Sequence, residues 1–514
     1  MVRNIPSGFS IVSEDIPFHI TRGYVQQQYD TPASSPVTST PTPTPTSFSP
    51  EKYAQPYIDF MTNNPTVFHA VAAFAKQLEE AGYEYLSERT IWKVRPGGKY
   101  YATRNSSSII AFAVGKEYKP GNGIGIVAGH VDALTAKLKP VSKLANKSGF
   151  EQLAVAPYAG GLNSTWWDRD LGIGGRVLLK GKDGKIQEKL VKLDWPIARI
   201  PTLAPHFGAA ANGPFNKETQ MVPIIGLDNS DLVGVSSASS TSLNIQPGTF
   251  AATQPERLVK AISAALDVQD YSSIVNWELE LFDIQPAQLG GIDKELIFAG
   301  RIDDKLCCFA AIEALLASPD DASPGIVKLF AGFDDEEIGS YLRQGARSNF
   351  TLSVIERIVE ATSGSDAAPG PNLINSTLAN SFLVSSDVIH AVNPNFLGAY
   401  LPNHSPRLNV GVAVSADPNG HMTTDSVSTA LLSRIAEKAG STLQLFQIRN
   451  DSRSGGTIGP MTSSKLGVRA IDAGIPQLSM HSIRATTGSL DPGLGVQLFK
   501  GFYDFYEEVD KEFQ

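Results

Sequence analysis

The chain has 514 residues, of which 42% are hydrophobic and 18% are charged, and its formal net charge is -9. That length is too great for one hydrophobic core, so we expect two domains with extensions. The acidic balance argues against nucleic acid as the main partner, because phosphate binding needs a basic face. Apolar runs stay below the roughly 18 residues of a membrane-spanning helix, so we expect no membrane span.

Residues 1–50 differ in composition from the rest of the chain. The stretch 31–50 is almost entirely Ser, Thr and Pro with a few Ala and Val, which cannot bury enough apolar surface to order itself. We interpret it as a linker behind a short N-terminal element. Two interpretations stay open: a dispensable tail, or a propeptide or sorting segment in which residues 8–29 fold against a partner.

The only two cysteines, Cys307 and Cys308, are adjacent. Neighbours this close rarely bridge each other, and they fit a reducing compartment during folding. The first residues contain no apolar run typical of a signal peptide. We therefore expect synthesis in the cytoplasm.

Globular sequence begins near Lys52. Residues 66–83 carry apolar side chains at helical spacing after Pro65, which suits a helix start. Residues 108–114 and 123–128 are strand-like. We assign residues 51–135 to the first part of a catalytic domain.

The amino-acid composition changes after this segment. Residues 137–275 are richer in Gly, Pro, Ser and Asn, with short β-like runs such as 176–179 and 187–193. We interpret residues 136–285 as an inserted second domain. From Leu279 onward, short apolar strands alternate with helical stretches, which predicts an α/β layered domain around a central sheet over residues 286–514.

Five apolar, strand-like runs each end in acidic residues or histidine. The residues that follow these runs are His130 and Asp132, Asp303 and Asp304, Asp334 to Glu337, Asp387, and His481. In α/β sheets, ligands gather outside the carboxyl ends of the strands. We therefore expect these side chains to converge on one site.

Such a cluster favours a metal site. Packed carboxylates repel one another and are costly to desolvate, and a divalent cation removes that cost. Two histidines with three carboxylates suit zinc, and one carboxylate shared between two ions gives a co-catalytic pair. In the doubled Glu336-Glu337, one side chain could bind metal and the other act as general base. Asp132 is placed to accept the second imidazole N–H of His130.

Each motif also has a simpler explanation when taken alone. Residues 334–337 could be a solvated loop, one of Asp303 and Asp304 could cap the following helix, and His130 and His481 could be structural. Their shared position after strand-like runs favours the metal site. The remaining candidates are open: His206 has no evident reason to reach the site, His421 could line a pocket or be structural, and Gly456, in a Gly-rich stretch, could let the backbone approach a substrate or only turn the chain.

Taken together, these motifs resemble the vacuolar aminopeptidase I and aspartyl aminopeptidase family, from about residue 52 to the C-terminus. The resemblance rests on His130-Val-Asp-Ala-Leu-Thr, Arg301-Ile-Asp-Asp, Asp334-Asp-Glu-Glu-Ile-Gly-Ser, Ser386-Asp387, Ser454-Gly-Gly-Thr-Ile-Gly-Pro and Met480-His481-Ser-Ile-Arg. It implies an α/β fold: a di-zinc exopeptidase domain with a central mixed sheet flanked by helices, interrupted by a β-rich dimerisation domain. It also implies a homo-dodecamer built from dimers.

The resemblance also implies roles for individual residues. The implied metal ligands are His130, Asp303, Glu337, Asp387 and His481, with Asp303 bridging two zinc ions. Glu336 matches the catalytic base and Asp132 the residue that orients His130. His206 matches a histidine lent to the active site of a neighbouring subunit.

Substrate and location follow from the same resemblance. Aspartyl-preferring members carry a lysine near the pocket, but the stretch 417–422 here contains none, which favours neutral, leucine-like N-terminal residues. His421 and Gly456 are the expected substrate contacts, together with His206. Vacuolar members are delivered from the cytosol by selective autophagy, which predicts a vacuolar location and a receptor for the N-terminal extension; a cytoplasmic location is the alternative.

The resulting hypothesis is a zinc aminopeptidase. The two zinc ions polarise a shared water, Glu336 takes its proton and passes it to the leaving amine, and zinc with His206 stabilises the oxyanion. Three rivals stay open: an aspartyl aminopeptidase, an assembly or autophagy cargo scaffold without activity, and a carboxypeptidase or deacylase with a similar di-zinc site.

Overall fold

The structure is a computed structural model that describes residues 48–229, 243–364 and 370–513. The interpretation of the N-terminal extension as a tail or propeptide therefore falls almost wholly outside the described residues. Within the described ranges, no helix is both long and apolar enough to cross a membrane.

The largest element is a nine-stranded mixed sheet, in the order β1-β2-β3-β13-β4-β14-β18-β16-β17. Its strands are β1 Glu84–Tyr85, β2 Lys99–Arg104, β3 Ser108–Val114, β4 Ile124–His130, β13 Val327–Phe333, β14 Phe382–Ser385, β16 Ala413–Ser415, β17 Gln444–Phe446 and β18 Arg469–Gly474. The four central strands, β13, β4, β14 and β18, pair in parallel, whereas β2 with β3, β3 with β13, and β16 with β18 pair antiparallel. Every residue of β4 and β13 is buried, as expected for strands covered on both faces.

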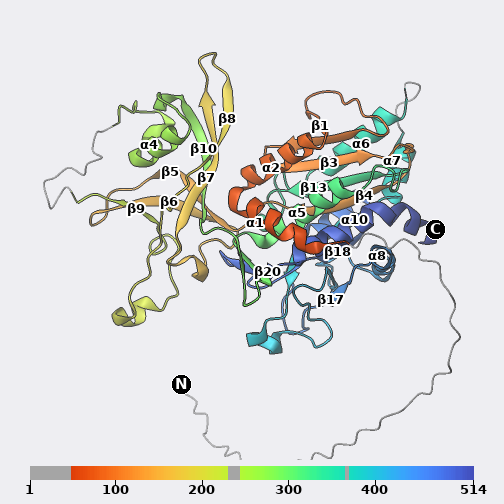
Figure 1. Ribbon diagram of the computed structural model, residues 1–514. Helices are drawn as coiled ribbons and strands as arrows, with labels where there is room; N and C mark the ends of the chain where they lie inside the picture. Colours follow the sequence, from red (N-terminus) through yellow and green to blue (C-terminus); the bar gives the residue numbers. More distant parts are fainter. Residues whose placement is uncertain (1–47, 230–242, 365–369, 514) are drawn as a thin grey trace, which may run out of the picture. The chain divides into compact units, whose positions relative to one another are not determined.

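Helices cover both faces of this sheet (Figure 1). One face carries α1 Ala54–Asn63, α2 Val67–Glu80, α5 Ile302–Ala317, α8 Ser426–Ala439 and α10 Asp491–Asp510; the other carries α6 Phe350–Thr362, α7 Pro371–Ala379 and α9 Ile458–Leu466. Because side chains alternate along a strand, Ile126 of β4 packs with the second group and Val127 with the first. The predicted central mixed sheet flanked by helices is confirmed.

A second, six-stranded sheet is built entirely from antiparallel pairs, in the order β8-β7-β10-β5-β6-β9. Its strands are β5 Thr135–Lys143, β6 Phe150–Tyr158, β7 Leu171–Lys180, β8 Ile186–Lys192, β9 Ile224–Leu227 and β10 Ile274–Asp283. With α4 Glu256–Ala265 it encloses a core that includes Trp166 and Trp277. The domain boundaries at 136 and 285, and the dimerisation role, stay predictions.

Two of the five predicted strand ends lie outside the large sheet. The run before Asp303 forms β12 Leu296–Ala299, which pairs with β11 Gln288–Gly290 and β20 Ala485–Gly488; the run before His481 contributes β19 Pro476–Gln477, which pairs with β15 Ile389–His390. Burial alternates along β12, in contrast to the fully buried β4. A half-buried strand belongs in a peripheral sheet, so these two runs approach the site from beside the large sheet.

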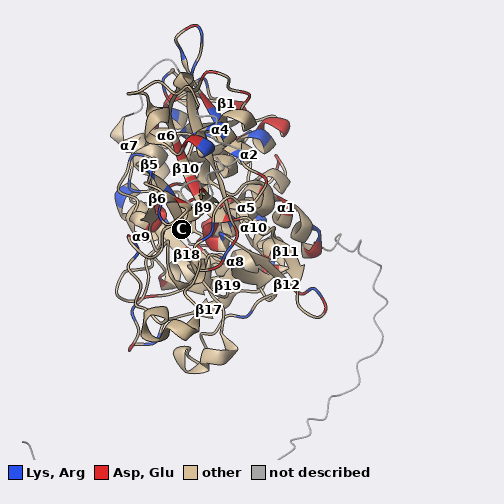
Figure 2. Ribbon diagram, turned by 90° about the vertical axis from the view of Figure 1, so that its left-hand side faces the viewer, with Lys and Arg blue, Asp and Glu red and all other residues tan. Residues whose placement is uncertain are grey.

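Charged residues are mixed over the surface elements. Figure 2 shows acidic and basic residues interspersed around β1, α2 and α4. Mixed charges keep a surface solvated without building a strong field of one sign.

Candidate metal centre

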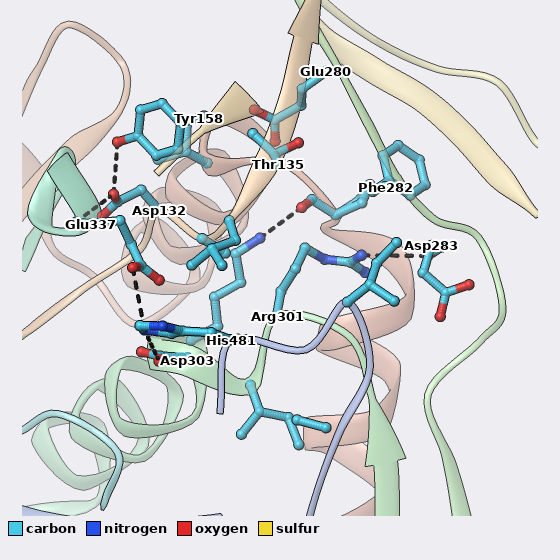
Figure 3. A pocket seen from close by; sticks show the side chains of 18 of the residues that line it. Asp132, Thr135, Tyr158, Glu280, Phe282, Asp283, Arg301, Asp303, Glu337 and His481 are labelled. Carbon is cyan, nitrogen blue, oxygen red and sulfur yellow. Dashed lines mark hydrogen bonds and ion pairs between the residues drawn. The ribbon is translucent and has the colours of Figure 1, made fainter. Parts of the chain in front are cut away.

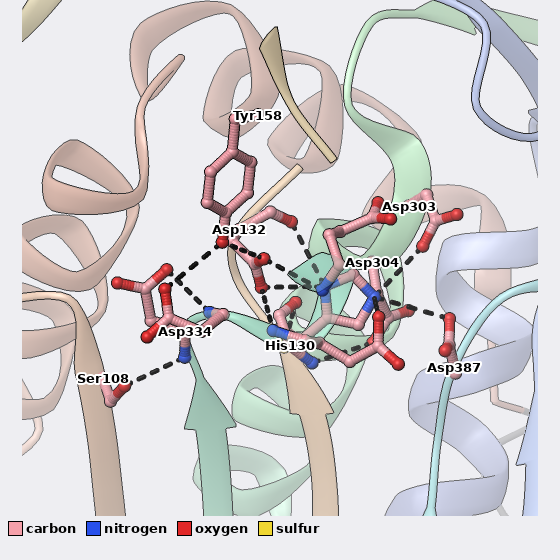
Figure 4. A network of polar contacts seen from close by, with 12 residues as sticks. Ser108, His130, Asp132, Tyr158, Asp303, Asp304, Asp334 and Asp387 are labelled. Atoms are coloured by element: carbon pink, nitrogen blue, oxygen red, sulfur yellow. Dashed lines mark hydrogen bonds and ion pairs between the residues drawn. The ribbon is translucent and has the colours of Figure 1, made fainter. Parts of the chain in front are cut away.

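His130 is the last residue of β4, and its ring lies among carboxylates on both sides (Figure 4). Its Nδ1 is 3.2 Å from Oδ1 of Asp132. Its Nε2 is 3.1 Å from Oδ1 of Asp303, 3.7 Å from Oε2 of Glu336 and 3.7 Å from Oδ1 of Asp387. We call His130 with Asp303, Glu336 and Asp387 the inner arm of the site.

Asp303 also faces a second histidine. Its other oxygen, Oδ2, lies 3.5 Å from Nε2 of His481, and the same nitrogen is 3.6 Å from Oε2 of Glu337. We call His481 with Asp303 and Glu337 the outer arm. Asp303 therefore presents one carboxylate oxygen to each arm.

The donor atoms of this cluster fit divalent cations. Two triads, His130-Asp303-Glu337 and His130-Glu336-Asp387, bring their ligand atoms within 4.8 Å of one another. Nε2 of His130 and Oε1 of Glu337 are buried without a hydrogen bond within the described structure, even though Asp303 approaches the former. Mixed imidazole and carboxylate donors suit zinc.

The electrostatics of the carboxylates agree with that fit. Burial, with neighbouring Asp387, raises the pKa of Glu336 to about 8. Burial, with neighbouring Asp303, raises the pKa of Asp387 to about 6. Carboxylates packed this closely resist ionisation, and a bound cation would favour their charged forms.

Asp132 connects the cluster to the strand ends. Its Oδ1 accepts the backbone N–H of Glu336 at 3.2 Å, and its Oδ2 accepts that of Glu337 at 3.2 Å. These two glutamates start η6, Glu336–Ile338, which Asp334 and Asp335 separate from the end of β13. One buried carboxylate thus contacts the His130 ring and fixes the turn that carries both glutamates.

An apolar cavity of about 380 Å³ opens beside the cluster. Asp303, Glu336, Glu337, Asp387 and His481 are among its polar lining residues, together with His390 and Asp472. Its apolar side is formed by Val388, Ile389, Met422, Phe446, Ile448, Met461 and Met480. Among the described residues that line it, none is Lys or Arg.

The protein family described as aminopeptidase I zinc metalloprotease (M18) matches residues 60–503. The chain belongs to this M18 family. It is therefore a metalloaminopeptidase, a hydrolase that acts on peptides, and the predicted enzyme class is confirmed.

Two curated relatives carry different names. The chain is 45% identical over 471 residues to vacuolar aminopeptidase 1 of Saccharomyces cerevisiae, covering 90% of each chain. It is 41% identical over 497 residues to an aspartyl aminopeptidase of Aspergillus oryzae, covering 91% of this chain and 99% of the relative. Relatives with both names are thus similar along nearly their whole length.

Solved structures of M18 relatives share the fold. The mApe1 structure from Chaetomium thermophilum is 58% identical, covers 91% of this chain and 100% of that one, and matches with a TM-score of 0.84. The mApe1 dodecamer of S. cerevisiae is 39% identical, covers 90% and 99%, and matches with a TM-score of 0.78.

Asp304 has a role in the site that the sequence did not predict. Its Oδ2 accepts the backbone N–H of His130 at 3.2 Å, and its Oδ1 accepts that of Val388 at 3.2 Å. It is fully buried and does not cap its own helix, one of the two roles considered for this pair. Asp304 instead holds together the backbones that carry His130 and Asp387.

A second cavity shares Asp303, Glu337 and His481, the residues of the outer arm, with the first one (Figure 3). Asp132, Tyr158, Glu280, Arg301 and Lys305 are among its lining residues. Lys305 is buried, which lowers the pKa of its ammonium to about 7, and it donates to the carbonyls of Asn64 and Pro65 at 3.0 and 2.9 Å. This lysine ties the start of α5 to the chain that enters α2.

The three predicted substrate contacts have different positions. Gly456 lines the apolar cavity. His421 points its Nδ1 at Asp417, and its neighbour Met422 reaches the cavity in its place. His206 lies exposed in η3, Pro205–Ala211, and lines neither cavity. The structure therefore brings Gly456 to the site and leaves His421 and His206 outside it within one chain.

Proposed function

We propose that this M18 enzyme removes neutral, leucine-like residues from the N-termini of peptides, using two zinc ions. The observation that carries the proposal is the position of Asp303. It faces His130 with one carboxylate oxygen and His481 with the other, beside an apolar cavity. A shared carboxylate is the arrangement of co-catalytic metal pairs.

The two arms would each hold one ion. His130, Asp387 and Asp303 would hold the inner ion, and His481, Glu337 and Asp303 the outer one. When bound, zinc at these positions supplies Lewis-acid polarisation of the peptide carbonyl and lowers the pKa of water.

Glu336 acts as the general base in this proposal. It takes a proton from the attacking water and returns it to the amine that leaves as the peptide bond breaks. Its backbone N–H is held by Asp132, which also faces Nδ1 of His130. Asp132 therefore orients both the base and the histidine.

The apolar cavity would take the side chain of the first substrate residue. An acidic side chain there would need a cationic partner, and the described lining residues include no Lys or Arg. Because one similar protein is named an aspartyl aminopeptidase, a preference for acidic N-terminal residues is the second candidate function.

Assembly and location extend the proposal. The dodecameric S. cerevisiae relative supports a dodecamer, within which His206 would reach a neighbouring copy's site and stabilise the oxyanion. Exposed Phe150 and Leu227, on neighbouring strands of the six-stranded sheet, would contribute to a dimer contact. The vacuolar relative supports a vacuolar location, reached through a receptor for residues 1–50, with the cytoplasm as the alternative.

Hydrolysis of Leu-, Asp- and Lys-p-nitroanilide tests the function directly. The purified protein is assayed as isolated, after chelation and after zinc is added back. Activity on the Leu substrate that is lost on chelation and restored by zinc is expected. Preference for the Asp substrate would favour the aspartyl candidate, and inactivity with metal bound would favour a scaffold.

A further inference from the structure

One hydroxyl group reaches the metal centre from the six-stranded sheet. Tyr158, the last residue of β6, is 8% exposed, and its OH donates to Oδ2 of Asp132 at 2.7 Å (Figure 4). The same OH lies 3.3 Å from Oδ1 of Asp335. The ammonium of Lys137, on the paired strand β5, sits 3.9 Å from the centre of the Tyr158 ring. The ring is thus held in place by its own sheet.

The contact matters because of what Asp132 holds. The carboxylate faces the His130 ring and accepts the backbone N–H groups of Glu336 and Glu337. Tyr158 donates to the same oxygen that holds Glu337. Removing the Tyr158 hydroxyl would leave Oδ2 of the buried Asp132 with one hydrogen-bond donor fewer. The Asp132 carboxylate would then rotate more freely.

A second contact from the same chain segment reaches the outer arm. The side-chain amide of Asn163 donates to the backbone carbonyl of His481 at 2.8 Å, and Oγ1 of Thr165 accepts the N–H of Ile483 at 2.9 Å. His481 has a φ of 62°, a left-handed conformation that is uncommon for residues other than glycine. These hydrogen bonds hold the loop in that conformation.

The segment that makes both contacts, residues 158–165, is anchored in the six-stranded sheet. A side chain at Gly161 would meet the carbonyl of Thr135 at 2.1 Å, so the segment packs directly on β5. Leu162 and Trp166 are each 1% exposed in the core of this sheet. Lys217 donates to the carbonyl of Gly161 at 2.9 Å. An anchored segment can fix the position of what it touches.

We infer that residues 158–165 position both arms of the metal centre, with Tyr158 acting through Asp132 and Asn163 acting through the backbone of His481. The inference rests on the proposed zinc aminopeptidase function. In it, the six-stranded sheet positions the metal centre of its own chain. Tyr158 and Asn163 are positioning residues, because neither is among the proposed zinc ligands.

The first test compares Tyr158→Phe with Tyr503→Phe. Tyr503 is also fully buried and donates to the carbonyl of Leu329, away from the site, so it is a matched control. For Tyr158→Phe we expect kcat to fall roughly 10- to 100-fold with KM within about twofold, and zinc affinity to fall by a similar factor in competition with a chromophoric chelator. Tyr503→Phe should lower Tm while kcat and zinc affinity stay at wild-type values.

The second test compares Asn163→Ala with Asn146→Ala. Asn146 also bridges two backbone groups, at Gly149 and Asp228, in an exposed turn. Asn163→Ala should weaken binding of one of the two zinc equivalents by roughly tenfold, the range for partners that orient ligands. Asn146→Ala should leave both equivalents unchanged.

The wild-type protein in the same experiments separates the inference from the function. If wild type shows zinc-dependent Leu-p-nitroanilide hydrolysis while Tyr158→Phe and Asn163→Ala keep wild-type kcat and zinc affinity, the inference alone is overturned. If wild type binds no zinc and cleaves none of the substrates, the proposed function fails, and the inference fails with it.

Discussion

The inner and outer arms of the metal centre differ in how they are held. The His130 side chain is 1% exposed at the end of a fully buried strand, whereas the His481 side chain is 55% exposed on a loop in a left-handed conformation. The inner arm is fixed by the sheet, Asp132 and Asp304. In the outer arm, His481 is held through its backbone carbonyl by Asn163 of the segment 158–165, and Asp303 is shared with the inner arm. Two arms with the same kinds of ligand can thus differ in rigidity. We therefore expect the inner and outer arms to differ in zinc affinity.

The largest effect should come from Glu336, the proposed base in the inner arm. Glu336→Gln keeps the size of the side chain but cannot take a proton, so kcat should fall by roughly 10³-fold, within the range for loss of acid–base catalysis. Zinc content, measured by atomic absorption, should stay at the wild-type level. Glu356→Gln on an exposed turn of α6 is the control, and wild-type kcat in Glu336→Gln would refute the assignment.

Removing each histidine tests the comparison itself. His130→Ala should lose the inner ion and also lower the free energy of unfolding by roughly 1–3 kcal/mol, because buried carboxylates lose a partner. His481→Ala should lose the outer ion with a smaller stability change, because its ring is largely solvated. Zinc titration and thermal unfolding measure both. Equal losses of stability in the two variants would contradict the comparison.

A charge in the apolar cavity should change the substrate preference. Met422 lines the cavity beside the outer arm, and Met422→Lys would give an acidic substrate side chain its missing partner. The ratio of kcat/KM for the Asp substrate to that for the Leu substrate should rise roughly tenfold. Met422→Leu conserves the apolar character and should leave the ratio unchanged; a rise in that variant too would mean that the charge is not responsible.

The smallest effect should be an acid-dependent loss of stability from α2. Burial, with the charges of Lys305 and Lys192, lowers the pKa of His69 to about 4, below its usual value near 6.5. The unfolded chain therefore takes up a proton first as pH falls below about 6.5, and stability declines until the pH reaches about 4. At pH 5 the free energy of unfolding is lower by about 2 kcal/mol than at neutral pH, which corresponds to a decrease in Tm of roughly 2 °C for a chain of this size.

His69→Gln cannot take up that proton, so the difference between its Tm at pH 7 and at pH 5 should shrink by this amount. His404→Gln, at a partly exposed histidine outside α2, is the control. An unchanged pH dependence in His69→Gln would assign the effect to other groups.

Local pattern predicted much of the fold. The strand predicted over residues 108–114 is β3, and the helix predicted over 66–83 is α2, with Thr66 accepting a hydrogen bond from the N–H of His69 as its N-cap. The helix signal is a periodicity of 3.6 residues and the strand signal is a short continuous apolar run, and the chain carries both without reference to its tertiary contacts. The sheet to which each strand near the site belongs was harder to predict. In sequence, β12 and β19 resemble the strands of the central sheet, but both lie in small peripheral sheets. Whether a strand is buried on both faces depends on how the molecule packs.

The sequence by itself determined which donor-bearing residues could form a metal centre, because His130, Asp303, Glu336, Glu337, Asp387 and His481 each follow an apolar run. Tertiary structure alone decided how they are oriented. It turned His421 toward Asp417, gave Asp304 two backbone amides to hold, and brought Asn163 to a carbonyl 318 positions away. Such contacts depend on the direction of each side chain after packing, and no local periodicity encodes that direction.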